Sequence, residues 1–124
     1  MEIRVADASA IAAVLFAEPD AEAVAERFAS ATLVAPTLLP LEVANVCWIK
    51  IRKHPSQRSD LLDAFAAFDR LRVELVEVDP RASLNMAVAA GLTVYDACYL
   101  WLARQLDAEI VTLDQALARA AASP

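Results

Sequence analysis

Four acidic residues stand in otherwise apolar parts of the sequence. They are Asp7, Glu42, Asp96 and Asp114. An isolated buried carboxylate costs several kcal/mol of stability, roughly, so carboxylates that converge in a folded core imply a bound cation. Hard divalent ions prefer oxygen ligands, and Mg²⁺ is typically held by a few carboxylates together with substrate phosphate. These four residues are therefore candidate metal ligands, with Mg²⁺ as the first choice of ion.

Each of the four acids also has a purely structural explanation. Asp7 and Asp114 precede predicted helices and suit helix N-caps. Asp96 is the last residue of a Thr-x-x-Asp capping box that begins at Thr93. Glu42 has no basic residue three or four positions away with which to form an ion pair along a helix, so its structural explanation is weaker.

The elements that position these acids alternate short apolar runs with helical stretches, a pattern typical of a parallel sheet covered by helices. Asp20 is expected to cap a helix after Pro19, and Gly91, the single glycine, is expected to end one in the left-handed conformation. Asp7 and Asp114 follow predicted strands, at the sheet edge where open parallel sheets bind ligands. The predicted strands are 3–6, 32–35, 73–78 and 109–112, and the predicted helices are 8–17, 21–30, 38–53, 57–71, 81–90, 95–106 and 115–122.

Length and composition predict one compact domain over residues 1–124. The chain is 59% hydrophobic and 23% charged, which favours a globular, helix-rich protein. Cys47 and Cys98 are expected to be buried, free thiols of a reducing compartment, and the start of the sequence resembles no secretion signal, so we expect a cytoplasmic protein. The apolar stretch 28–49 is not expected to cross a membrane, because Pro36 and Pro40 interrupt it.

The charge distribution leaves room for a nucleic-acid substrate despite a formal net charge of -6. Five basic residues gather within nine positions. Charge reversal across four of them, Lys50, Arg52, Lys53 and Arg58, is predicted to weaken RNA binding, whereas for His54 a solvated helix end is favoured over a phosphate contact. Trp48 and Trp101 are assigned to the core in preference to an interface. The basic residues are Lys50, Arg52, Lys53, His54 and Arg58.

Four sequence blocks, in this order and spacing, resemble the PIN domains of VapC-type toxins. The first is the strand that runs into Asp7-Ala8-Ser9, and the second is the proline-containing segment 36–45 around Glu42. The third is Tyr95-Asp96-Ala97 with Tyr99 following, and the last is the Thr112-Leu113-Asp114 end of a strand. The resemblance spans residues 5–117, and Glu18-Pro19 is a further similarity.

The resemblance implies an α/β fold, a single PIN-like domain with a central, mostly parallel sheet of four to five strands flanked by helices. It implies a ribonuclease that hydrolyses phosphodiester bonds, with Asp7, Glu42, Asp96 and Asp114 holding one or two Mg²⁺ or Mn²⁺ ions and Ser9 and Thr112 supporting them. It also implies a toxin that inhibits translation and growth, a cognate VapB-type antitoxin that covers the acidic site, and a homodimer.

Other classes of protein fit the residues less well. A haloacid-dehalogenase site needs a second Asp two positions after the first, where this chain has Ser9, and a receiver domain needs an acidic pair and a late Lys. One glycine cannot form a dinucleotide-binding loop, and one His with two scattered Cys cannot form a zinc site. The remaining alternative is a catalytically silent PIN-like interaction module that keeps the acids as caps and core polar groups.

Overall fold

A four-stranded parallel sheet forms the centre of the protein in the computed structural model, which describes residues 2–123. The strand order is β3-β2-β1-β4, and all three pairings are parallel, so the predicted mostly parallel sheet is confirmed with four strands. Both ends of the predicted 1–124 domain, Met1 and Pro124, lie outside the described residues. The strands are β1 (Glu2–Ala6), β2 (Ala31–Pro36), β3 (Glu74–Val76) and β4 (Glu109–Val111).

Within residues 2–123, seven α-helices connect and cover the strands, at positions close to the predicted ones. Gly91 ends α5 with φ +69°, as predicted, whereas Asp20 begins α2 without the expected side-chain capping bond. The helices are α1 (Ala8–Leu15), α2 (Ala21–Phe28), α3 (Leu39–Lys53), α4 (Arg58–Ala66), α5 (Pro80–Ala90), α6 (Val94–Leu106) and α7 (Gln115–Ala122).

The predicted helix 57–71 was wrong as one continuous element. Short 3₁₀ helices at Pro55–Gln57 and Ala67–Leu71 flank α4. Phe65, Phe68 and Leu71 all pack against the core and are spaced by three residues. Because a 3₁₀ helix has three residues per turn, the tighter winding keeps such residues on one side. Packing of these apolar side chains thus explains the departure from a regular α-helix.

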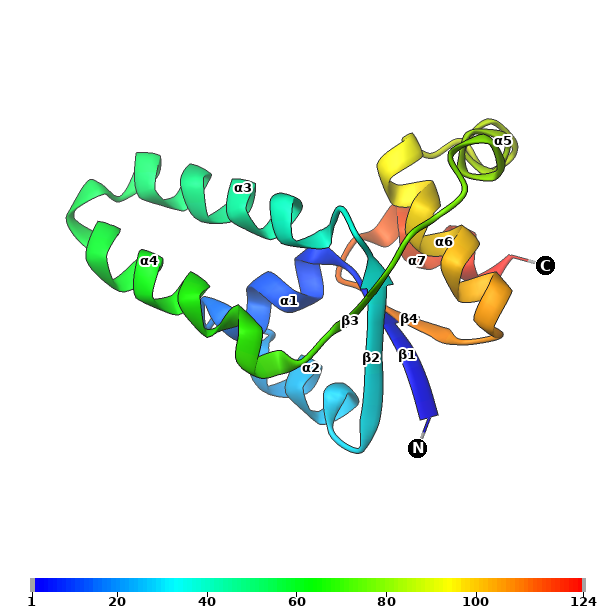
Figure 1. The fold of residues 1–124 in the computed structure, drawn as a ribbon. Coiled ribbons are helices and arrows are strands. Elements are labelled where there is room, and N and C mark those ends of the chain that lie inside the picture. Colours follow the sequence, from blue (N-terminus) through cyan, green and yellow to red (C-terminus); the bar gives the residue numbers. More distant parts are fainter. Residues whose placement is uncertain (1, 124) are drawn as a thin grey trace.

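The helices form layers on the two faces of the sheet (Figure 1). Helix α6 packs against β1, β2 and β4 on one face, and α5 and α7 lie against α6. Helices α1 and α2 lie on the other face, with α2 in contact with β2. Because the middle of α6, residues 97–103, is largely buried and contacts three strands, α6 is the main element joining the sheet to the outer helices.

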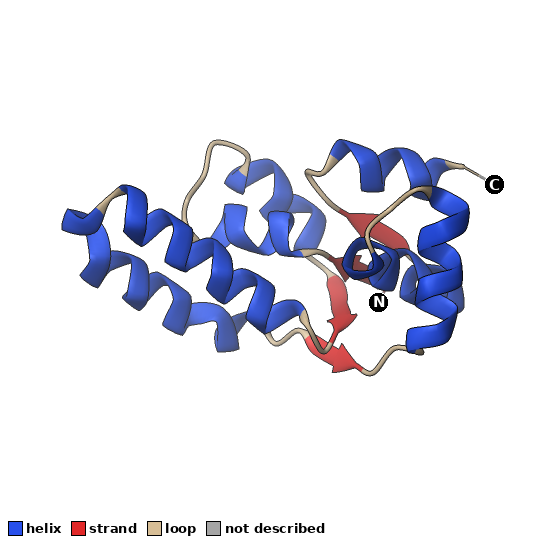
Figure 2. Cartoon of the chain, turned by 90° about the horizontal axis from the view of Figure 1, so that it is seen from above, coloured by secondary structure: helices blue, strands red, loops and turns tan. Residues whose placement is uncertain are grey.

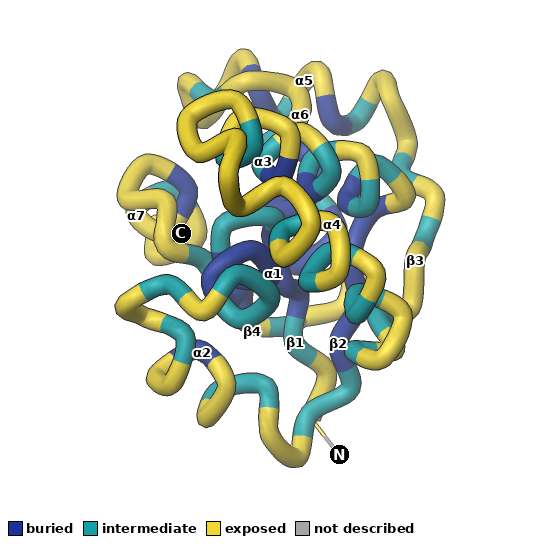
Figure 3. Tube along the Cα trace, turned by 90° about the vertical axis from the view of Figure 1, so that its left-hand side faces the viewer, coloured by how far each residue is buried: buried dark blue, intermediate teal, exposed yellow. Residues whose placement is uncertain are grey.

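Helices α3 and α4 form a hairpin that projects away from the sheet, an arm that is clearest from above (Figure 2). Much of α4 is exposed (Figure 3). Trp48 on α3 is 54% exposed, so its assignment to the core was wrong. Trp101 is partly buried against the core. Trp48 is exposed because only one face of α3 packs inward, and that face includes Leu39, Val43 and Cys47.

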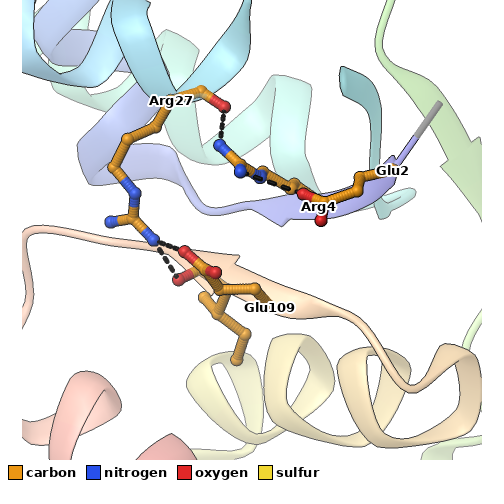
Figure 4. Close-up of polar contacts among 5 residues, drawn as sticks. Glu2, Arg4, Arg27 and Glu109 are labelled. Atoms are coloured by element: carbon orange, nitrogen blue, oxygen red, sulfur yellow. Dashed lines mark hydrogen bonds and ion pairs between the residues drawn. The ribbon is translucent and has the colours of Figure 1, made fainter. Parts of the chain in front are cut away.

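The amino end of the sheet is held by a polar network (Figure 4). Arg4 on β1 donates to the Arg27 carbonyl of α2 and pairs with Glu2 at 3.0 Å. Arg27 in turn pairs with Glu109 on β4. These contacts fix α2 at the amino ends of β1 and β4, on the opposite edge from the candidate acids.

Two further expectations concern the cysteine thiols and the absence of a membrane-spanning helix. Cys47 and Cys98 are buried and free, as predicted. Among residues 2–123 no single helix is long and apolar enough to cross a membrane; α5 and α6 reach the required length and composition only together, and they are bent by 104°.

Candidate active site

The carboxyl edge of the sheet brings together the amino ends of several helices. Asp7 follows β1 and caps α1, while Asp114 follows β4 and caps α7. Glu42 and Asp96 lie in the first turns of α3 and α6. Helix amino ends carry partial positive charge and free N–H groups, so each position favours a carboxylate even before any ligand binds.

Asp7 is the most buried of the four acids, at 5% exposure. Its Oδ1 accepts hydrogen bonds from Ser9 Oγ at 2.7 Å and from the Ala10 amide at 3.0 Å, and its Oδ2 accepts one from Thr112 Oγ1 at 2.5 Å. Burial raises the pKa of Asp7 above its usual value, and the three hydrogen bonds partly oppose that rise. An ionised carboxylate can accept about four hydrogen bonds, which leaves Asp7 one acceptor site for a cation.

Ser9 and Thr112 connect the ends of β1 and β4. Besides donating to Asp7, the Ser9 hydroxyl accepts from the Leu113 amide at 2.9 Å. The Thr112 hydroxyl likewise accepts from the Asp114 amide at 3.0 Å. These two hydroxyls therefore fix the Asp7 carboxylate relative to the backbone that carries Asp114.

Glu42 obtains a hydrogen-bond partner from a helix distant in sequence. The Tyr99 hydroxyl of α6 donates to Glu42 Oε1 at 2.6 Å, and Tyr99 is only 1% exposed. Burial raises the pKa of Glu42, the Tyr99 hydrogen bond lowers it, and the charges of Asp96 and Asp7 raise it. Burial and the neighbouring carboxylate also raise the pKa of Tyr99, so its hydroxyl stays protonated and remains a donor.

Asp96 and Asp114 complete the acidic edge. The Asp96 amide donates to Thr93 Oγ1 at 3.1 Å, as expected for a capping box. The Asp114 carboxylate accepts from the Leu117 amide at 2.9 Å, so it caps α7. Partial burial and the charge of Asp114 raise the pKa of Asp96. The structural role predicted for Asp7 and Asp114 as caps is therefore real, and it leaves a part of each carboxylate available.

The four acids form a ring of electrostatic neighbours, which we call the acidic ring. Asp7 repels Glu42, Glu42 repels Asp96, Asp96 repels Asp114, and Asp114 repels Asp7. A positive charge placed among these carboxylates would relieve their repulsion. Carboxylate oxygens are also the ligands that hard divalent ions prefer. Among residues 2–123, however, no three Asp, Glu, His or Cys side chains are arranged closely enough to hold a metal ion as they stand.

A cavity of about 480 Å³ opens beside the acidic ring, and Glu42 forms part of its wall. A second cavity, of about 530 Å³, lies between α2, the start of β2 and residues 70–72, and none of the four acids lines it. Of these two cavities, the first is the candidate substrate site although it is smaller, because it adjoins the candidate carboxylates through Glu42 and the second does not.

Two features of the site were not predicted from the sequence. The Tyr99 hydrogen bond to Glu42 was missed, although a Tyr among buried apolar residues signals a hydroxyl that needs a partner. Lys50, grouped with the RNA-contacting residues, forms an ion pair with Glu18 at 2.8 Å and lies over the Phe16 ring. It therefore fastens the arm to the end of α1.

Comparison with known proteins identifies relatives over nearly the whole chain. The family model of the PIN domain matches residues 4–123. The protein named Ribonuclease VapC3 from Pyrobaculum aerophilum is 35% identical over 120 residues, which cover 92% of this chain and 91% of that protein. The crystal structure of PAE2754 from Pyrobaculum aerophilum has the same fold, with a TM-score of 0.77 at 22% identity, covering 98% of this chain and 81% of that one. With its parallel sheet and these matches, the chain belongs to the PIN-domain family, as a VapC-type member.

Proposed function

We propose that this protein is a metal-dependent endoribonuclease and the toxin of a VapBC-type toxin–antitoxin pair, which inhibits translation and growth by cutting RNA. The observation that carries the proposal is the acidic ring, in which four carboxylates from four helix starts gather at the carboxyl edge of a parallel sheet, and neighbouring acids help to raise the pKa of Asp7, Glu42 and Asp96. Membership of the PIN family and the relative named as a ribonuclease support the same activity.

In the proposed site, Asp7, Glu42, Asp96 and Asp114 hold one or two Mg²⁺ or Mn²⁺ ions. When bound, a divalent ion activates water and neutralises charge on the scissile phosphodiester. Asp7 is held by Ser9 and Thr112, and Glu42 is held by Tyr99, so two of the ligands are oriented before substrate arrives. A bound cation would offset the mutual repulsion of these carboxylates.

The proposed partners are an RNA substrate, a cognate VapB-type antitoxin and a second copy of the chain, in the cytoplasm. Exposed apolar side chains on α3 and α5, including Leu41 at 77% and Val88 at 78% exposure, offer surface for protein contacts.

A catalytically silent interaction module is the second candidate, and specific observations favour it. Asp7 and Asp114 both cap helices, and among residues 2–123 no assembled metal-ligand set is present. On this alternative the acids serve only the fold.

Cleavage of a mixed cellular RNA pool by the purified, antitoxin-free protein with Mg²⁺ or Mn²⁺ separates the two candidates. The matched samples are Asp7→Asn, Asp96→Asn, an EDTA control, and Asp60→Asn on exposed α4. We expect metal-dependent cutting by the wild type and by Asp60→Asn, and a loss of at least about a hundredfold in the two site variants. No metal-dependent cutting by folded wild-type protein would favour the silent module.

A further inference from the structure

We propose that the cavity beside the acidic ring binds the nucleobase next to the scissile phosphate, with Tyr95 stacking on the base and Asn45 contacting its edge. The inference rests on the proposed ribonuclease function and extends it, because it assigns residues that select where the RNA is cut. The cavity measures about 480 Å³, which is within the usual range for small-ligand sites, about 300–1,000 Å³.

The location of the cavity ties it to the acidic ring. Glu42, a proposed metal ligand, lines the cavity, and Tyr95 in its wall directly precedes Asp96. A phosphodiester held at the carboxylates carries its own nucleoside within one ribose of the reacting atoms. Because Glu42 belongs both to the proposed metal site and to the cavity wall, a base attached to that ribose can reach this cavity.

Tyr95 has the features of a stacking platform. It stands at the start of α6, is 65% exposed, and lines the cavity. An aromatic ring in this position presents a face on which any base can stack, which is the common mode of recognition for single-stranded RNA. The apolar remainder of the wall consists of Ala8, Leu38, Leu41 and Val46.

Asn45 supplies a hydrogen-bonding group that can distinguish bases. It lies three residues after Glu42 on α3, so the two side chains occupy neighbouring positions on one helix face. Asn45 is exposed and lines the cavity, so its side-chain amide is accessible to a ligand there. An amide offers two donors and an acceptor, enough to pair with a base edge. Glu42 and Asn45 thus place a candidate metal ligand and a candidate base contact one turn apart.

The charge of the site favours a base over an acidic peptide in this cavity. The wall contains the Glu42 carboxylate and no basic side chain. A neutral, planar ring with polar edges is compatible with that wall, whereas additional carboxylates would be repelled. The phosphate of the same nucleotide would instead lie at the cation-binding acids.

The test uses a short RNA that contains a site cut by the wild type, made with the natural base or with an abasic ribose at each nucleotide that flanks the cut. Cleavage is measured as kcat and KM for the wild type, Tyr95→Ala, Tyr95→Phe and the remote control Glu22→Ala, at an exposed position on α2. We expect the wild type and Glu22→Ala to lose roughly tenfold or more in kcat/KM when one flanking base is removed, chiefly through KM. With intact RNA, the kcat/KM of Tyr95→Ala should already be lower than that of the wild type by the same factor, and removal of the base should lower it little further. Tyr95→Phe keeps the aromatic ring, so its kcat/KM should again fall when the base is removed.

A second variant tests the edge contact. Asn45→Ala is expected to change the order of preference among the four bases at the same position, measured with four RNAs that differ only there. The inference would be overturned if the losses in kcat/KM from Tyr95→Ala and from base removal were additive, or if Asn45→Ala left the base preference unchanged. In either case, cleavage of intact RNA by the wild type would still support the proposed function. Normal cleavage by Tyr95→Ala together with lost inhibition by the cognate antitoxin would instead identify the cavity as a protein-docking site. If the wild type cuts no intact RNA, the proposed function fails first and the inference fails with it.

Discussion

At the scale of single residues, the site depends on hydrogen bonds that hold carboxylates in place. The sequence indicated Asp7, Glu42, Asp96 and Asp114 because each is an acid within an apolar pattern, and it indicated Ser9 and Thr112 by resemblance. The bond from Tyr99 to Glu42 joins residues 57 positions apart. No local pattern specifies such a pairing, since it depends on how α3 and α6 meet at the sheet edge.

Tyr99→Phe removes the donor and leaves the Glu42 carboxylate half-buried without its partner. A hydrogen bond to a charged group contributes about 1.5–3 kcal/mol, so we expect the Mg²⁺ concentration for half-maximal cleavage to rise about tenfold or more. Because Tyr99 does not itself touch the RNA in this account, cleavage should recover toward the wild-type rate at saturating Mg²⁺. A lowered rate that excess Mg²⁺ does not restore would show that Tyr99 does not act by positioning Glu42.

At the scale of elements, strand and helix positions followed from apolar periodicity, proline and the single glycine. Periodicity was insufficient for the arm. The apolar stretch 28–49 suggested a deeply buried helix or a subunit contact, and α3 presents Leu41, Trp48 and Ile49 to solvent. Composition does not reveal how many neighbours a helix has, and α3 packs mainly against α1 and α4. The division of 57–71 into α4 and a 3₁₀ helix was likewise set by tertiary packing.

The arm also determines where its basic residues lie. Glu42 and Lys53 are separated by 11 positions on α3, or about 16 Å along the helix axis at 1.5 Å per residue. Arg52 stacks over Trp48, with the guanidinium 4.9 Å from the ring centre. In the proposed function, basic residues at this distance would contact phosphates away from the cut and add affinity without entering the chemistry.

The double variant Arg52→Glu/Lys53→Glu is expected to weaken RNA binding at low salt and to reduce the dependence of the affinity on salt concentration. Each lost phosphate contact lowers the slope of log affinity against log salt by about 0.7 for a single strand. The matched control is Arg81→Glu/Arg119→Glu, which makes the same charge change at exposed positions on α5 and α7. Equal effects of the two double variants on binding would show that net charge matters and that the arm has no special role. Lys50 is left intact because it pairs with Glu18.

At the scale of the whole molecule, the parallel sheet explains why acids far apart in sequence meet at one edge. It also makes the stability of the metal-free protein depend on pH. The folded-state pKa values of Asp7, Glu42 and Asp96 are raised above their reference values of 3.8, 4.5 and 3.8. Between each reference value and the raised folded value, the native state binds more protons than the unfolded state, so stability falls as the pH rises.

We therefore expect the unfolding midpoint of the protein in EDTA to decrease as the pH rises from about 4 through the raised pKa values of these acids. Asp7→Asn removes one titrating group and should flatten that decrease, whereas exposed Asp60→Asn should not. Thermal unfolding followed by circular dichroism across the pH range measures both. A wild-type midpoint that rises with pH throughout this window would contradict the raised pKa values.

The central claim is that the acidic ring binds a divalent ion, and calorimetric titration of the folded protein with Mn²⁺ tests it most directly. The wild type is compared with Asp7→Asn, Glu42→Gln, Asp96→Asn and Asp114→Asn, and with the exposed control Asp63→Asn on α4. The account predicts saturable binding by the wild type and by Asp63→Asn, and binding weakened about tenfold or more in each of the four site variants. Absence of saturable binding by the folded wild type, or equal binding by all the variants, would contradict it.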